Sequence, residues 1–131
     1  MPDKNDIIIR LKSVAVRTGK LCMVLPRTVV NKVYANQIIR SSSSGSANYR
    51  SACRGKSKAD FINKLRIVEE EFDETMHFYE LLAEFNEGAK KELRELYKES
   101  NELLSIIVAS VNTSLKNMAA ERVKGNNAKQ I

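Results

Sequence analysis

The feature that most constrains the fold of this chain is a regular apolar stripe near its centre. Between residues 61 and 82, apolar side chains recur at alternating steps of four and three residues. That spacing places them along one side of a helix, in the pattern by which helices pack side by side in bundles. The stripe predicts one long core helix, whose buried side would be formed by Phe61, Leu65, Val68, Phe72, Thr75 or Met76, Tyr79 and Leu82.

Two helices are predicted before this stripe. Asn5 or Asp6 can cap the first helix through a side-chain oxygen, and Pro26 ends it because proline disfavours a helical residue before it. Thr28 can cap the second helix. The small-residue run at 41–47, SSSSGSA, falls within that second helix and has two interpretations.

By composition, residues 41–47 are a flexible linker. The alternative is a helical segment whose small side chains let a neighbouring helix approach closely. Helical spacing from Tyr34 through Gly45 to Asn48 favours the helix. A local bend at Gly45 is compatible with that interpretation, because glycine costs about 1 kcal/mol relative to alanine inside a helix.

The segment 54–56, Arg-Gly-Lys, is the clearest turn in the sequence. Gly55 suits a left-handed backbone position after a helix end. Ser57 can cap the next helix, with Asp60 three residues on in an arrangement like a capping box. The turn therefore separates the second helix from the central stripe.

A fourth helix is predicted after the break at 86–88, from about Ala89 to about Met118. Its second half, residues 105–115, is apolar around more of its circumference than one stripe requires. An apolar surface of that width needs a second partner, which points to self-association or to deeper burial within the subunit.

These elements predict an all-α fold, an up-down-up-down antiparallel four-helix bundle. Residues 1–118 would form a single domain. Residues 119–131 are polar and are expected to fray or to be a disordered tail.

Charge is distributed unevenly along the chain. Residues 1–66 carry 14 Lys and Arg against 3 Asp and Glu, whereas residues 67–131 carry 8 against 13. One interpretation is a basic helical hairpin that pairs with an acidic one, so that most charges are solvated or paired. The other is a basic patch for nucleic acid.

The basic residues that would contact nucleic acid gather around the predicted turn. Arg50 and Arg54 are four residues apart and so share one face of a helix. Tyr49 is close enough in sequence to offer a stacking surface for a base. The hypothesis of a nucleic-acid site rests on Arg40, Arg50, Arg54, Lys56 and Lys58.

Nothing in the sequence assembles a catalytic site. His77 is the only histidine, and it ends a Glu-x-x-His motif that begins at Glu74. Di-iron bundles need two such motifs, and one histidine cannot supply them within one subunit. Hydrolase triads lack a placed base, and no P-loop or GxGxxG is present. We expect no enzyme, no catalytic residues, no cofactor and no metal.

Cysteine usage and hydropathy bear on the compartment. Cys22 and Cys53 lack CxxC spacing and are interpreted as small buried thiols rather than a disulfide. No uninterrupted apolar run approaches the roughly 20 residues of a membrane span, and the N-terminal MPDKND lacks the order of a signal peptide. The expected location is cytoplasmic, without a membrane partner.

The central stretch also carries residues that match a known family: QIIR at 37–40, Asn48, Tyr49, Ala52, Ser57, DFINKL at 60–65, Ile67, Glu70, Glu71, Glu74 and Thr75. On these residues the chain resembles the four-helix-bundle family that includes proteins encoded within intervening sequences of bacterial large-subunit ribosomal RNA genes, formerly labelled ribosomal. The resemblance extends over about residues 6–118 and is specific over 37–82. Many members have Ile-Pro where this chain has Ser44 and Gly45.

The resemblance implies a helical bundle that assembles as a ring-like homo-oligomer, a homopentamer in known members. The family's biochemical role is poorly defined, and distantly similar bundle proteins assist reverse transcriptases and bind RNA. It supplies no catalytic residues. We therefore expect a non-enzymatic homo-oligomer that binds RNA or DNA through a basic patch with low sequence specificity. The alternative is a structural or protein-partner scaffold with no nucleic-acid role.

Overall fold

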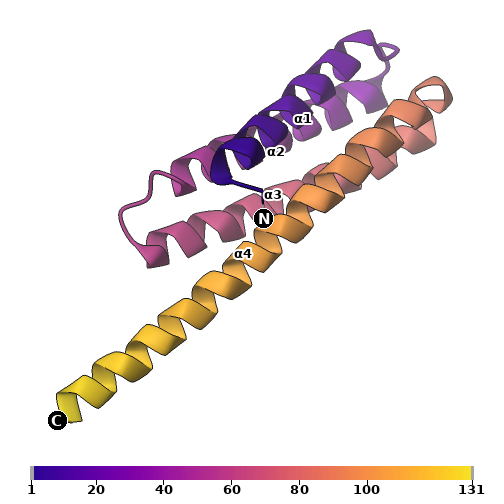
Figure 1. Cartoon of the computed structure of the whole chain (residues 1–131). Helices are drawn as coiled ribbons and strands as arrows, with labels where there is room; N and C mark the ends of the chain where they lie inside the picture. Colours follow the sequence, from indigo (N-terminus) through magenta and orange to yellow (C-terminus); the bar gives the residue numbers. More distant parts are fainter. Residues whose placement is uncertain (1, 131) are drawn as a thin grey trace.

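A computed structural model describes residues 2–130, which form four long α-helices and one short 3₁₀ helix (Figure 1). The helices are α1 (Lys4–Val24), α2 (Val29–Ala52), α3 (Lys58–Phe85) and α4 (Lys90–Gln130), with η1 (Glu87–Ala89) before α4.

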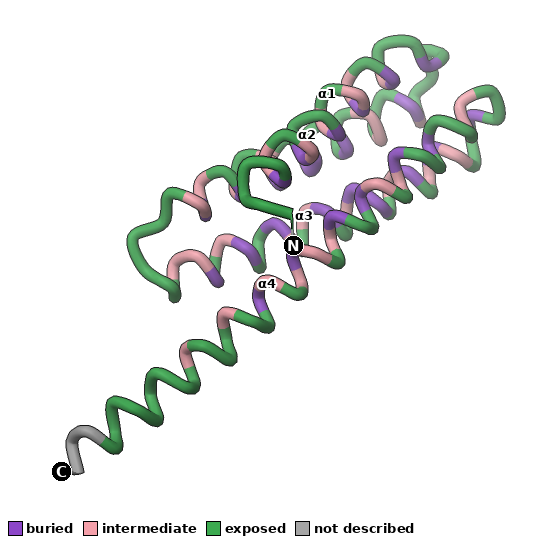
Figure 2. Tube along the Cα trace, viewed as in Figure 1, coloured by how far each residue is buried: buried purple, intermediate pink, exposed green. Residues whose placement is uncertain are grey.

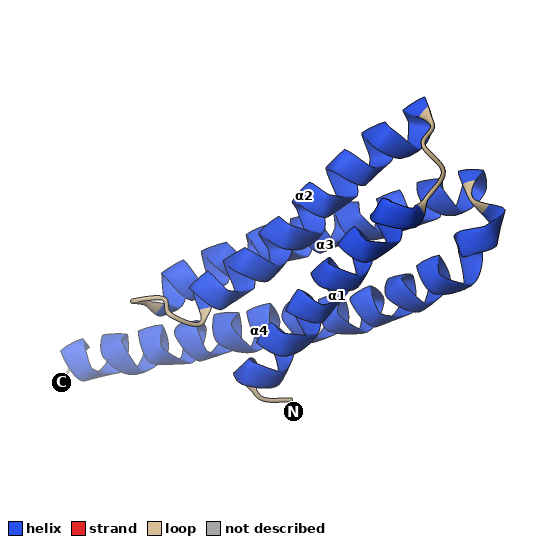
Figure 3. Cartoon of the chain, turned by 90° about the horizontal axis from the view of Figure 1, so that it is seen from above, coloured by secondary structure: helices blue, strands red, loops and turns tan. Residues whose placement is uncertain are grey.

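The four α-helices pack as the predicted up-down-up-down bundle. Each helix packs against the next one in the chain, and α1 also packs against α4, so that the helices surround a shared core. Short loops join successive helices at alternate ends of the bundle (Figure 3). This arrangement lets four amphipathic helices bury their apolar sides with few residues spent on connections.

The apolar stripe of α3 lies at the centre of the core. It is buried from Leu65 to Leu82, as its spacing predicted. The first position differs, because Ile62 is buried and Phe61 is only half-buried. Figure 2 shows that the buried residues of all four helices face inward along the bundle.

The run at 41–47 is a continuous part of α2, so the linker interpretation is wrong. A Cβ atom on Gly45 would lie 2.4 Å from Cε2 of Phe72 on α3. Real Cβ atoms do not approach a ring so closely, so only glycine lets the two helices meet here. The small residues therefore serve close helix packing.

Hydrogen-bonded polar pairs are buried at three levels of the bundle. They join Thr18 to Tyr79 (2.6 Å), Ser41 to Thr75 (2.7 Å) and Asn31 to Asn86 (2.8 and 2.7 Å). Leaving one partner unpaired costs about 1–3 kcal/mol, so a shift of one helix along another is penalised at each level.

Two of the predicted caps are confirmed and one is wrong. Thr28 accepts a hydrogen bond from the Asn31 amide, and Ser57 accepts one from the Asp60 amide. The cap of α1 is Asp3, which precedes both residues proposed from the sequence. It accepts from the backbone N–H of Asp6 at 2.9 Å, so the helix begins earlier than the sequence predicted.

The end of α4 differs from the prediction. The helix does not stop at Met118 but continues to Gln130, with every side chain from 119 to 127 exposed (Figure 2). No proline follows Met118, and Ala119, Ala120 and Glu121 are good helix formers. The backbone therefore continues as helix after its apolar partners end. Met1 and Ile131, which the predicted domain and tail include, lie outside the described residues.

One helix of the described chain, between Glu87 and Asn127, is long and apolar enough over part of its length to span a membrane. Ser and Asn side chains interrupt the apolar residues of this stretch, so it contains no uninterrupted apolar run of about 20 residues. A single helix of this kind is weak support for a membrane, because the core helix of a soluble protein meets the same criterion. Buried residues make up 17% of the stretch, and the other large apolar side chains between 103 and 118 are half-buried except Leu115, which is 40% exposed.

Candidate nucleic-acid interface

The connection between α2 and α3 forms a tight turn at one end of the bundle. The amides of Arg54 and Gly55 donate to the carbonyls three residues earlier, at 3.1 and 3.0 Å. The expectation of a left-handed Gly55 is wrong, because no glycine among the described residues has a positive φ. A Cβ atom there would lie 3.0 Å from the carbonyl oxygen of Ala52, a tight contact with backbone, and 2.8 Å from Oδ2 of Asp60, whose side chain can move aside.

The turn borders a hollow that we call the basic groove, with a volume of about 580 Å³. It brings together three of the five residues predicted from the sequence, Arg50, Arg54 and Lys56. The complete lining is Ala47, Arg50, Ser51, Arg54, Gly55, Lys56, Asp60 and Lys64.

The charges of the basic groove are not balanced by acids. Arg50, Arg54 and Lys56 are exposed, and none forms an ion pair with any residue of the described chain. The single carboxylate, Asp60, lies 3.5 Å from Nζ of Lys64. Lys64 also donates to Oγ of Ser51 at 2.8 Å. The groove is thus a positively charged surface open to solvent.

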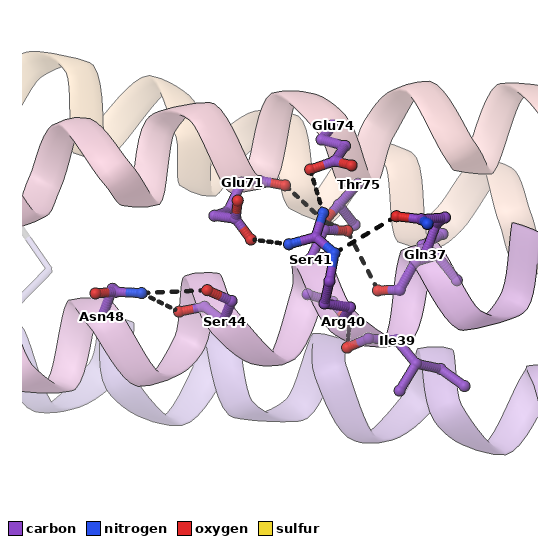
Figure 4. A network of polar contacts seen from close by, with 11 residues as sticks. Gln37, Ile39, Arg40, Ser41, Ser44, Asn48, Glu71, Glu74 and Thr75 are labelled. Atoms are coloured by element: carbon purple, nitrogen blue, oxygen red, sulfur yellow. Dashed lines mark hydrogen bonds and ion pairs between the residues drawn. The ribbon is translucent and has the colours of Figure 1, made fainter.

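Arg40 lies apart from this groove. It is ten residues before Arg50 on the same helix, or about 15 Å along the axis. Its guanidinium donates to Glu71 at 3.1 Å and to Glu74 at 2.5 Å, and so it bridges α2 to α3 (Figure 4). These hydrogen bonds raise the pKa of Arg40 above its usual value. The charge of Arg40 is therefore paired with two carboxylates of the same subunit.

Lys58 is also separated from the groove. Its ammonium group pairs with Glu121 of α4, beyond the end of the bundle core. It lines a different hollow with Lys4, Phe61 and Asn117, on the α4 side of the turn. The five predicted residues therefore divide into three that share a groove and two that form intramolecular ion pairs.

Tyr49 does not provide the stacking surface that the sequence indicated. It is 4% exposed and packs in the core beside Leu65 and Phe72. Burial raises the pKa of its phenol. The residue positions the last turns of α2 and has no face open to a base.

Two basic residues of this surface were missed from the sequence. Lys64 enters the basic groove from α3, and its only local signal is Asp60 one helical turn earlier. Lys12 lines an adjoining hollow between α1 and α2, and that hollow shares Ala47 and Arg50 with the basic groove. Residues from three helices converge here, and only the tertiary fold shows it.

The remaining chemistry-bearing side chains do not form a site. His77 is exposed and contacts the ring of Phe78, with ring centroids 5.6 Å apart. Within the described residues, no group of three His, Cys, Asp or Glu side chains is placed to hold a metal ion. Both cysteines are free thiols and half-buried, and burial raises the pKa of Cys22 to about 11. A thiol with that pKa is protonated and unreactive at neutral pH.

The fold and the basic groove define the class of protein: an all-α four-helix bundle with a positively charged surface at one end. The family follows from comparison with known proteins. The chain belongs to the 23S rRNA-intervening sequence protein family, whose family model matches residues 4–109. The expected membership is confirmed.

A solved structure supports the same assignment. It is the crystal structure of a protein with unknown function from the S23 ribosomal protein family of Bacteroides thetaiotaomicron. The two chains share 30% identity with a TM-score of 0.72, over 83% of this chain and 97% of the other. Comparison with curated proteins gives no significant match.

Proposed function

We propose that this protein is a non-enzymatic homo-oligomeric bundle that binds the phosphate backbone of RNA or DNA in the basic groove. The observation that carries the proposal is that Arg50, Arg54 and Lys56 line one open groove without forming an ion pair to any described residue. Arginine and lysine bind phosphates whatever the base sequence, so the binding is expected to have low sequence specificity.

Self-association supports the proposal because it multiplies the groove. In the second half of α4, Leu104 and Val108 are half-buried and Leu115 is 40% exposed, so part of its apolar surface is available to a helix of another copy. In a ring of identical subunits, of which a homopentamer is the size that the family resemblance implies, the grooves repeat and their fields add. No membrane is needed, and the location we propose is cytoplasmic.

The alternative function is a scaffold that binds only itself or another protein. It is favoured by Arg40 and Lys58, because both use their charges in contacts within the subunit. On that account the excess of positive charge stabilises the assembly. The two functions differ in what the basic groove does, and a binding measurement separates them.

The test is fluorescence anisotropy with a short labelled single-stranded RNA, and with its DNA counterpart, at low salt. Arg50→Glu combined with Arg54→Glu should weaken binding at least tenfold, because both phosphate contacts become repulsive. Circular dichroism should show unchanged helix content, since both side chains are exposed.

The matched control is Lys91→Glu combined with Lys98→Glu, two exposed residues of α4 outside the basic groove. This variant has the same net charge as the groove variant and should retain most of the affinity. Loss of affinity in both variants would show a net-charge effect and remove the groove from the account. Absence of binding by the wild-type protein would leave the scaffold function.

A further inference from the structure

Two apolar stripes reach the surface of the subunit, one of them largely exposed and the other mostly half-buried. The first lies on α1, where Ile9, Val16 and Met23 are 65%, 46% and 82% exposed. Their spacing of seven residues places them on one side of the helix, along about 21 Å of its axis. Large apolar residues in such a row are typical of a helix that packs against a partner.

The α1 stripe runs beside a shallow groove between α1 and α2. This α1/α2 groove has a volume of about 410 Å³, and Val16 lies in its lining. Its floor includes the small residues Ser43 and Ala47, and its cations are Lys12 and Arg50. The groove can therefore admit apolar side chains, and it is bordered by positive charge.

The second stripe lies on α4. Tyr97, Leu104 and Val108 are half-buried, and Leu115 is 40% exposed. Steps of seven, four and seven keep them on one side of the helix over about 27 Å. The α1 stripe is shorter by about 6 Å, or roughly one helical turn.

Acidic residues of α3 border the α4 stripe. Tyr97 lines a hollow of about 350 Å³ between α3 and α4, together with Glu80, Ala83 and Arg94. Asp73 and Glu80 are near enough for their negative charges to add to burial in raising the pKa of the Tyr97 phenol. The stripe on α4 is thus apolar along its length and acidic along its α3 side.

The two surfaces lie on different sides of the bundle, because the α1 stripe borders the groove between α1 and α2 and the α4 stripe borders the hollow between α3 and α4. We propose that the α1 stripe of one subunit packs against the α4 stripe of a second copy of this chain. Both surfaces are apolar and they carry opposite charge, with Lys12 beside the α1 stripe facing Asp73 and Glu80 of the next subunit while Arg50 stays open in the basic groove. Such a head-to-tail contact repeats from copy to copy, and closes into a ring if the rotation permits.

The inference rests on the self-association in the proposed function and specifies its surfaces. A head-to-tail contact permits a complementation test. Val16→Glu combined with Met23→Glu disables the α1 stripe, and Val108→Glu combined with Leu115→Glu disables the α4 stripe. Each variant alone should be a monomer, whereas an equal mixture should form a species of two subunits through the one intact pair of surfaces.

The masses are measured by light scattering after size-exclusion chromatography. Ile67→Glu is the control, because Ile67 is 41% exposed and lines neither groove, so the wild-type mass should persist. If circular dichroism shows that the double variant of α4 is unfolded, Leu115→Glu alone replaces it, since Leu115 is exposed.

Each other result contradicts the account in a distinct way. A monomeric wild-type protein would remove the self-association itself. Variants that keep the wild-type mass would show that other surfaces form the contact. One monomeric variant beside one that still dimerises, or a mixture that stays monomeric, would exclude the head-to-tail pairing.

Discussion

At Gly45, the absence of one methyl group determines how closely α2 and α3 pack. The ring of Phe72 occupies the space that a Cβ atom would need, and that ring is fully buried. Gly19 of α1 provides a contrast, because nothing lies within 4 Å of its Cβ position. A side chain at position 45 would therefore collide with Phe72, whereas position 19 has room for one.

Gly45→Ala should destabilise the protein by about 1–2 kcal/mol. Overpacking against Phe72 costs about 1–3 kcal/mol, and the better helix propensity of alanine returns up to about 1 kcal/mol. Gly19→Ala should instead stabilise the protein by about 0.5–1 kcal/mol. Urea unfolding of both variants checks the prediction, and equal effects would show that the close approach at Gly45 does not limit the packing.

Arg10 connects α1 to α4 through two carboxylates. Its Nε lies 2.8 Å from Glu99 and its Nη2 lies 3.0 Å from Glu102. The hydrogen bond to Arg10 lowers the pKa of Glu99. A carboxylate with a depressed folded-state pKa contributes stability that is present above its unfolded pKa and lost as pH falls through its folded pKa.

Arg10→Gln should therefore lower the free energy of unfolding by about 0.5–1 kcal/mol at neutral pH. The difference from wild type should shrink as pH falls through the depressed pKa of Glu99, because protonated Glu99 no longer pairs with Arg10. Urea unfolding across the acidic range measures it. A difference that stays constant with pH would show that the ion pair is not its source.

At the scale of the elements, α4 has two different parts. Up to Met118 it packs against the bundle, and beyond that point its described side chains are exposed. The link from this outer part to the rest of the subunit is the exposed pair of Lys58 and Glu121. Gly125 also weakens the helix there, since glycine costs about 1 kcal/mol relative to alanine.

Removal of residues 119–131 should lower the free energy of unfolding by less than about 1 kcal/mol, the usual limit for an exposed ion pair. Helix content measured by circular dichroism should fall, because residues 119–130 are helical in the intact chain. A loss of several kcal/mol in urea unfolding would show that the segment packs against the bundle.

The elements were largely predictable because their signals are local. The stripe of α3, the break before α4 and the caps at Thr28 and Ser57 depend on residues a few positions apart. The end of α4 was missed because the prediction followed the apolar stripe, whereas backbone hydrogen bonds continue without it.

At the scale of the whole molecule, the uneven charge is only partly neutralised within the subunit. The turn residues Arg50, Arg54 and Lys56 were predictable as a group, because they are neighbours in sequence. Lys12 and Lys64 were not, because they reach this surface from other helices. Sequence likewise could not show that Arg40 and Lys58 are paired, since their partners lie far along the chain.

The most direct test of the account is the salt dependence of RNA binding. The affinity of wild-type protein for single-stranded RNA should fall linearly with salt on a log–log scale, because each phosphate contact releases a counterion. Replacing Arg50, Arg54 and Lys56 by Gln should reduce the slope by about 2, at about 0.7 per contact. Arg40→Gln should leave the slope unchanged, since that charge is used within the subunit. An unchanged slope in the triple variant would contradict the assignment of the basic groove as the nucleic-acid site.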